Sequence, residues 1–161
     1  MSNSILQTLD GMWIIYRLHH HEAVFTVAES KHLMSQIIAF HTKNLFLTDK
    51  SWHHHLVCIG AHERLSIKNF ARHYGLKDLC FGSEEDLQQQ LHSTPWSVSI
   101  FGIVYQTNTT LYCDVDIINQ PAIARHPNDN TMTLTISHQE LLRFLQMQWI
   151  TIHYCTSEVF V

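Results

Sequence analysis

The sequence predicts a mixed α/β fold in which helices cover one sheet. Short runs typical of strands interleave with segments whose apolar residues recur at helical spacing. They interleave too irregularly for repeated βαβ units, and no internal period or low-complexity segment is present. With 161 residues and 45% hydrophobic content, we expect one domain over residues 1–161 with a single substantial core.

In the first half of the chain, residues 4–9 fit a short helix that Ser4 caps and that ends at Asp10-Gly11. An amphipathic helix is expected after Ser30, because the apolar residues that follow recur at spacings of three and four. The strands expected here cover residues 13–18, 23–27, 45–47 and 53–59. The last two would pair as a hairpin.

In the second half, Ser66, Ser83 and Ser137 each precede a segment of helical periodicity, and Gly75 is placed to end the first of these helices. An acidic residue three positions after Ser83 and after Ser137 is typical of a capping box. The strands expected here cover residues 97–105, 111–115, 131–136 and 149–155. The proline-containing stretch 119–130 is expected to be irregular.

Charge and composition limit the classes of partner. A net charge of −4 and an isoelectric point near 6.4 exclude a general basic surface for nucleic acid, so RNA binding would be local and no DNA partner is expected. The four cysteines lie far apart without a C-x-x-C pair, which favours reduced core residues. The N-terminus does not resemble a signal peptide and no apolar run approaches the length of a membrane span, so we expect a soluble cytoplasmic protein without a membrane partner.

Fourteen histidines, with triplets at 19–21 and 53–55, raise the question of a metal site. In a strand, His53 and His55 would share one face, but nothing nearby supplies a third ligand at a spacing typical of zinc. We therefore predict exposed strand and loop histidines, no metal and no cofactor. Such histidines would make the surface charge sensitive to pH near neutrality.

Residues 41–47, HTKNLFL, place a cation and an amide beside a short apolar run. A strand beginning there would hold Lys43 and Asn44 at its start and so fix the direction of the charge. Spacing alone also fits an ordinary solvated lysine beside a core strand, because one Lys-Asn pair is not a motif.

Two further segments change that balance: HEAVFTV at residues 21–27 and HPNDNTMT at 126–133. Together with TKNLFL at 42–47, they resemble the H-x-A-V-F-T-V, T-K-N-L-F-L and H-P-x-x-N-T-x-T patterns of the YbaK/ProX-type aminoacyl-tRNA deacylases. That family includes the editing domain inserted in bacterial prolyl-tRNA synthetases. The resemblance spans roughly residues 5–150, and its Lys-Asn pair is most similar to that of the freestanding deacylases of alanyl-tRNA-Pro.

The resemblance implies a mostly antiparallel, curved sheet covered by helices, and the removal of a mischarged amino acid such as alanine from tRNA-Pro. The implied partners are the 3′ end of an aminoacyl-tRNA and prolyl-tRNA synthetase. No serine lies in a G-x-S-x-G elbow and no cysteine has a context that marks a nucleophile. This suits the mechanism that the family implies, in which water attacks the ester with help from the substrate's own 2′-hydroxyl.

The resemblance also implies roles for individual residues. Lys43 would hold a phosphate or hydroxyl at the tRNA end, and Asn44 would add a hydrogen bond. His126 would orient the water or the ester, although a loop histidine before a proline is an equally good interpretation.

The remaining candidates would form the substrate pocket and its loops. His21 and Phe25 are candidates for the wall of the amino-acid pocket; the alternative is core packing, which is the favoured interpretation for Phe25. Asn130 and Thr131 would bind substrate or, alternatively, fix the backbone of their loop.

One segment departs from the family pattern. The family carries a G-x-x-x-P loop, usually within P-G-S-V-T-P, whereas residues 95–100 here are PWSVSI. Trp96 and Ile100 thus replace the glycine and the proline, and the large ring of Trp96 would change the path of the loop and the volume of the pocket. Trp96 and Ser97 are therefore also substrate-binding candidates.

Two functions follow from these observations. The first is a deacylase with a reshaped, narrower pocket in which Trp96 selects the amino acid; the retained Lys43, Asn44, His126 and Asn130 favour it. The second is a non-catalytic relative that binds tRNA, a synthetase or another partner. The altered loop and the acidic net charge favour this alternative.

Overall fold

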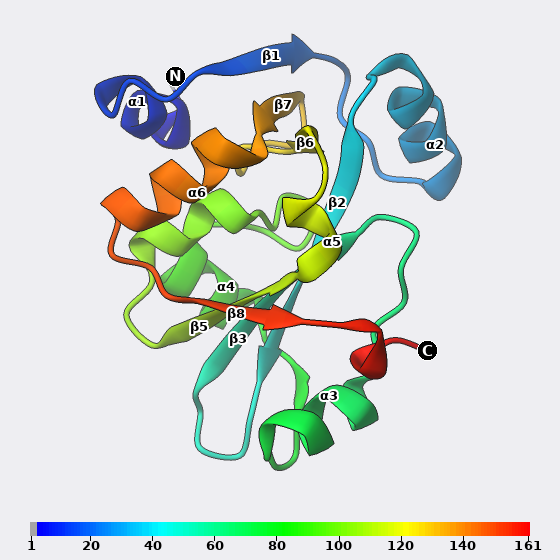
Figure 1. Cartoon of the computed structure of the whole chain (residues 1–161), viewed down its shortest axis with the longest axis vertical. Helices are drawn as coiled ribbons and strands as arrows, with labels where there is room; N and C mark the ends of the chain where they lie inside the picture. Colours follow the sequence, from blue (N-terminus) through cyan, green and yellow to red (C-terminus); the bar gives the residue numbers. More distant parts are fainter. Residues whose placement is uncertain (1–2) are drawn as a thin grey trace.

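The computed structural model describes residues 3–161 as one mixed sheet with helices on both faces (Figure 1). The strands are β1 Tyr16–His20, β2 Phe40–Thr48, β3 His54–Gly60, β4 Cys80–Phe81, β5 Thr109–Asp114, β6 Ala122–Arg125, β7 Met132–Ser137 and β8 Ile152–Cys155. Their order across the sheet is β1-β7-β6-β2-β3-β5-β8, with β4 paired to β2. Four of the pairs are antiparallel and three, β2–β6, β3–β5 and β5–β8, are parallel. The predicted mixed, mostly antiparallel sheet is confirmed.

The helices occupy the connections between strands. They are α1 Ser4–Gly11, α2 Val27–Gln36, α3 Ile67–Tyr74, α4 Glu84–Leu91, α5 Val115–Ile118 and α6 His138–Met147, with 3-10 helices η1 Ile100–Tyr105 and η2 Ser157–Val159. Within residues 3–161, none of these helices has the length and apolar content needed to cross a bilayer.

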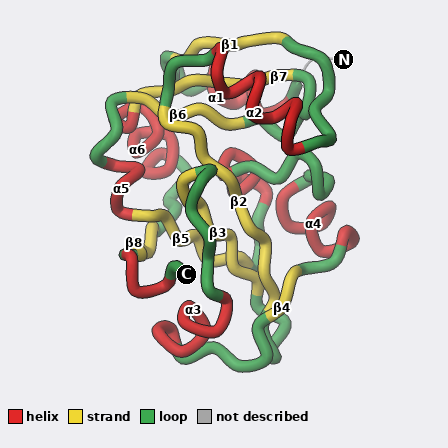
Figure 2. Tube along the Cα trace, turned by 90° about the vertical axis from the view of Figure 1, so that its right-hand side faces the viewer, coloured by secondary structure: helices red, strands yellow, loops and turns green. Residues whose placement is uncertain are grey.

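The long strand β2 joins the two halves of the sheet. Its first residues pair in parallel with β6, and residues 42–48 pair antiparallel with β3. Because alternate side chains of a strand point to opposite faces, Phe46 packs in a core with α1, α4, α6 and η1, whereas Leu47 packs in a second core with α3 and η2. The sheet therefore separates two hydrophobic clusters. Figure 2 shows α2 and α3 at opposite ends of the molecule.

Local signals placed several helix ends correctly. The hydroxyl oxygens of Ser66, Ser83 and Ser137 accept hydrogen bonds from the third backbone N–H of α3, α4 and α6, and Gly75 ends α3 in the left-handed conformation, with φ 68°. The N-cap predicted for α1, Ser4, is one residue too late. Asn3, not Ser4, accepts the hydrogen bonds from Ile5 and Leu6, because an asparagine carbonyl caps a helix as well as a hydroxyl does.

Three predicted elements were wrong. Residues 23–27 form no strand, because Thr26 and Glu29 make a capping box that begins α2. Residues 97–105 are not a strand either: Ser99 caps η1, and the apolar run after it is buried as a 3-10 helix. The stretch 119–130, expected to be irregular, contains β6, which is only four residues long.

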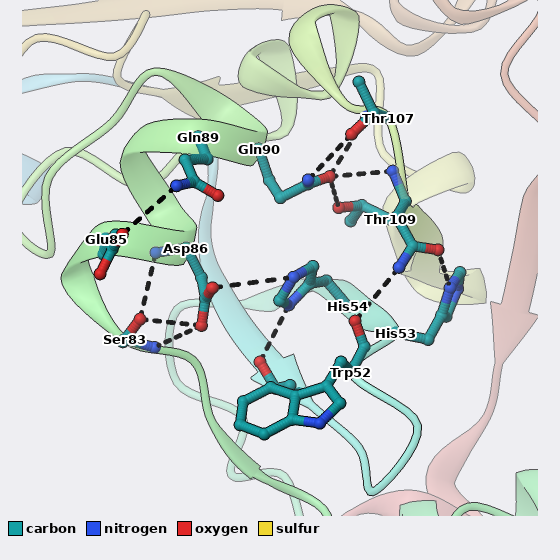
Figure 3. A network of polar contacts seen from close by, with 12 residues as sticks. Trp52, His53, His54, Ser83, Glu85, Asp86, Gln89, Gln90, Thr107 and Thr109 are labelled. Atoms are coloured by element: carbon teal, nitrogen blue, oxygen red, sulfur yellow. Dashed lines mark hydrogen bonds and ion pairs between the residues drawn. The ribbon is translucent and has the colours of Figure 1, made fainter.

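The second histidine triplet was expected to be exposed, but His54 and His55 are buried, at 6% and 2% exposure. The ring of His54 bonds to the hydroxyl of Thr48 at 2.9 Å and lies 4.0 Å from the carboxylate of Asp86, as part of the polar network in Figure 3. The ring of His55 pairs with Asp49 at 2.9 Å. These polar partners allow two imidazoles to lie inside the hairpin.

Candidate functional site

The chain forms an open cavity of about 420 Å³ between the parallel start of β2 and β6, the helix α2, and the loop before η1. Of the nine residues predicted for the site, five line this cavity: Phe25, Lys43, Trp96, His126 and Asn130. The other four, His21, Asn44, Ser97 and Thr131, lie outside its lining. Residues from four distant segments of the chain therefore meet here.

Lys43 lies in the middle of β2, opposite Ile59 of β3, and not at the start of the strand as predicted. Its half-buried side chain lines the cavity and makes no hydrogen bond or ion pair within residues 3–161. Burial lowers the pKa of Lys43, and the negative charge of Glu63 partly opposes that effect. A partly desolvated cation without a partner is well placed to bind an anionic or strongly polar ligand.

Asn44 alternates with Lys43 along β2 and so points to the opposite face of the sheet. It is only 8% exposed, and neither its amide oxygen nor its amide nitrogen has a hydrogen-bond partner in the described part of the chain. The side chain of Asn44 therefore cannot reach a ligand in the cavity from this position.

His126 follows β6, and its ring faces the cavity. Nδ1 lies 2.7 Å from the carbonyl oxygen of Met132, and since a carbonyl can only accept, Nδ1 donates. Burial, reinforced by the charge of Arg125, lowers the pKa of His126 to about 4. The ring is therefore neutral near pH 7, with the lone pair of Nε2 as a hydrogen-bond acceptor.

His21 lies behind His126, with the two ring centroids 5.9 Å apart. Its Nδ1 donates to the carbonyl of Glu22, so its Nε2 accepts from the hydroxyl of Thr133 at 2.9 Å. His21 thus supports the wall of the cavity without lining it.

The loops around the cavity are held by side chains that bond to backbone. The amide of Asn130 donates to the carbonyl of Val24 at 2.9 Å and accepts from its N–H at 3.4 Å. Thr131 bonds to Asp129 through its hydroxyl and its N–H. Buried Ser97 bonds to Ser93 and Thr94.

Arg125 is a cavity residue that the sequence analysis missed. Its guanidinium donates twice to the carbonyl of Val98, at 2.7 and 3.1 Å, and once to the carbonyl of Thr42, at 3.0 Å. Burial lowers its pKa to about 10, so it stays charged near neutral pH, and no carboxylate within residues 3–161 forms an ion pair with it. An arginine within the apolar run of residues 122–125 was the signal available in the sequence.

Two aromatic side chains stand at the mouth of the cavity. Phe25 and Trp96 are 56% and 58% exposed, and their rings meet edge to face at a centroid distance of 5.8 Å. Core packing, the favoured interpretation for Phe25, is therefore wrong. Phe25 precedes the helix α2 and does not lie in a strand.

The fold and the cavity define a domain of the aminoacyl-tRNA editing class. Residues 21–144 match the family described as "Aminoacyl-tRNA editing domain", and the chain belongs to this family. The predicted family relationship is thus confirmed.

Particular relatives agree with this assignment. The chain is 30% identical over 146 residues to prolyl-tRNA editing protein ProX of Acetoanaerobium sticklandii, covering 89% of each chain. It is 31% identical over 130 residues to prolyl-tRNA synthetase associated domain-containing protein 1 of Danio rerio, covering 78% of this chain and 71% of that one. A solved structure described as a candidate trans-editing enzyme for prolyl-tRNA synthetase shares the fold, with a TM-score of 0.71 at 14% identity over 96% of this chain and 97% of its own.

Proposed function

We propose that this chain is a trans-editing deacylase, which hydrolyses the ester of a mischarged aminoacyl-tRNA. The observation that carries the proposal is the meeting of Lys43, His126 and Asn130 in one cavity. These residues come from two of the three sequence segments that resemble the deacylases, and Phe25 from the remaining segment lines the same cavity. Membership of the editing-domain family and the likeness to ProX support the same reaction class.

The proposed reaction uses water as the nucleophile. The water oxygen attacks the ester carbonyl carbon, the bond from that carbon to the ribose oxygen breaks, and the proton passes to the ribose oxygen with help from the neighbouring 2′-hydroxyl. A histidine with a pKa of about 4 is a weak base, so His126 would orient the attacking water by accepting a hydrogen bond from it at Nε2. The cation of Lys43 would bind a phosphate or hydroxyl of the RNA end.

We further propose a small amino acid, such as alanine on tRNA-Pro, as the group removed. A synthetase pocket built for proline cannot firmly exclude alanine, because a few missing methylenes change binding by only about 1–3 kcal/mol. A cavity of about 420 Å³ whose mouth is narrowed by Trp96 and Phe25 would admit the smaller residue more easily. Prolyl-tRNA synthetase would then be the partner that generates the substrate.

The second candidate is a non-catalytic relative that binds tRNA or a synthetase. The observation that favours it is the replaced loop: Ile100, where the family has proline, is fully buried at the start of η1, and Trp96 replaces the glycine. A backbone donor aimed at an oxyanion contributes roughly 3–4 kcal/mol, so a displaced loop would slow hydrolysis by two or three decades.

Single-turnover deacylation of tRNA-Pro charged with alanine, serine, cysteine or proline tests the proposal, with the spontaneous rate measured beside it. We expect release of one small amino acid with proline spared, and loss of that activity in Lys43→Ala. Lys50→Ala, which removes an exposed lysine on the hairpin turn, is the matched control and should keep the wild-type rate. Spontaneous rates for all four substrates with a folded protein would favour the non-catalytic relative.

A further inference from the structure

The aromatic pair at the mouth of the cavity is not explained by stability. Phe25 and Trp96 expose more than half of their surface, although burial of large aromatic rings is among the strongest contributions to protein cores. Their edge-to-face contact leaves the indole of Trp96 with a broad solvent-facing surface. Exposed aromatic rings beside a cavity are typical of a surface that binds a flat ligand.

Hydrogen bonds hold the backbone on which the two rings are carried. The loop that carries Trp96 is tied on one side by Ser97, which bonds to Ser93 and Thr94, and on the other by Arg125, which binds the carbonyl of Val98. Fixed loops of this kind present a ring to a ligand without a further cost of ordering.

Phe25 is held in a similar way from the other side of the mouth. Its N–H donates to the carboxylate of Glu29 at 3.0 Å, and the residue before it, Val24, is held by both polar atoms of the Asn130 amide. The bonds to Asn130 tie the backbone beside Phe25 to the loop after β6, so the position of Phe25 does not depend on α2 alone.

The chemistry of the proposed substrate places a flat group at this position. In an aminoacyl-tRNA the amino acid and the terminal nucleobase are attached to the same ribose. If the aminoacyl group enters the cavity toward Lys43 and His126, the base must remain at the mouth, beside Trp96 and Phe25. A net charge of −4 also gives little general attraction for RNA, so stacking would supply affinity that charge does not.

We propose that Trp96, supported by Phe25, is a stacking platform for the terminal adenine of the RNA. This inference rests on the proposed function, because it takes the aminoacyl end of a tRNA as the ligand. It assigns to Trp96 a role in holding the RNA end, in addition to narrowing the entrance to the amino-acid pocket.

Binding of a stable substrate analogue tests the platform without hydrolysis. The probe is an RNA hairpin ending in CCA whose terminal ribose carries alanine through an amide, and the comparison probe has the same end with an abasic terminal nucleotide. We expect the wild type to bind the complete probe roughly tenfold or more tightly than the abasic probe, and Trp96→Leu to bind both equally weakly. Trp96→Phe should restore most of the preference.

Trp52→Leu is the matched control, because Trp52 is also exposed, at 75%, but lies on the β2–β3 turn outside the cavity lining. It should leave the preference unchanged. Equal binding of both probes by the wild type, or an equal loss of affinity for both probes in Trp96→Leu, would overturn the platform. Deacylation is measured separately. A wild-type protein that prefers the complete probe but does not hydrolyse aminoacyl-tRNA would disprove the proposed deacylase activity and support the stacking platform.

Discussion

Arg125 connects three segments that are far apart in the sequence. Its hydrogen bonds join the end of β6 to the carbonyl of Thr42 in β2 and to the carbonyl of Val98 in the loop before η1. A planar guanidinium can serve both acceptors at once, which a lysine ammonium on a flexible stem cannot do with the same geometry. The residue therefore fixes the loop that carries Trp96 as well as adding a charge to the cavity.

We expect Arg125→Met to lower the free energy of unfolding by about 2 to 4 kcal/mol, because it leaves the two carbonyls without their donor. Arg125→Lys should lower the free energy of unfolding by less, because a lysine can still donate a hydrogen bond to one of the two carbonyls. Urea unfolding of the purified proteins measures both changes. Arg17→Met, which removes an exposed arginine from β1, is the control and should stay within about 0.5 kcal/mol of the wild type. An equally small change in the free energy of unfolding of Arg125→Met would disprove the stabilising role of the Arg125 hydrogen bonds.

At the level of elements, helices with local caps were predictable from sequence. Ser66 and Ser83 bond to N–H groups only three residues away, so the signal lies within one turn. The strand β6 was not predictable, because four residues between two prolines become a strand only through pairing with β2 and β7. The prediction for residues 100–105 failed for a related reason. Its first four residues are all buried, and a continuously buried apolar run has no period that distinguishes a strand from a helix.

Some residues of the candidate site were likewise predictable from the sequence and others were not. Resemblance to a known family supplied Lys43, His126 and Asn130, which line one cavity. The contacts of Arg125 could not be predicted, because its acceptors are 27 and 83 residues away in the sequence. The missing hydrogen-bond partners of the Asn44 amide could not be predicted either. They depend on where the side chain of Asn44 lies, and the strand that was expected to start at Lys43 begins at Phe40 instead.

The helix α2 is weakly attached to the rest of the molecule. None of its residues is buried, and it borders both the candidate site and a second cavity of about 430 Å³ that shares Lys31, Met34 and His41 with the first. With little packing to stabilise it, the helix depends on the capping box formed by Thr26 and Glu29.

We therefore expect Thr26→Ala to speed amide hydrogen exchange within α2 by about fivefold, the equivalent of about 1 kcal/mol, while the global free energy of unfolding stays nearly unchanged. The matched variant Ser66→Ala removes the cap of α3, which buries Phe70 completely, and should lower the global value by about 1 kcal/mol. A global loss in Thr26→Ala equal to that in Ser66→Ala would show that α2 unfolds only with the whole domain.

At the scale of the whole molecule, histidines that lie partly or fully inside the fold make its stability depend on pH. Three of them, His54, His55 and His126, have pKa values lowered by burial, and they lie in two separate regions, the β2–β3 hairpin and the candidate site. A neutral imidazole is preferred in the fold, whereas the unfolded chain takes up a proton near pH 6.5. Both regions therefore resist protonation as the solution becomes acidic.

The sign of the pH dependence follows from that difference. Between pH 6.5 and the folded pKa values, the unfolded chain binds more protons than the native protein, so the free energy of unfolding falls as the pH is lowered. For His126, with a folded pKa of about 4, the loss between pH 7 and pH 5 is roughly 2 kcal/mol. Urea unfolding at pH 7, 6 and 5 measures this decline. His126→Gln should flatten the decline, whereas His20→Gln, at an exposed position on β1, should leave it unchanged. An equal or greater free energy of unfolding at pH 5 would contradict the burial of neutral histidines.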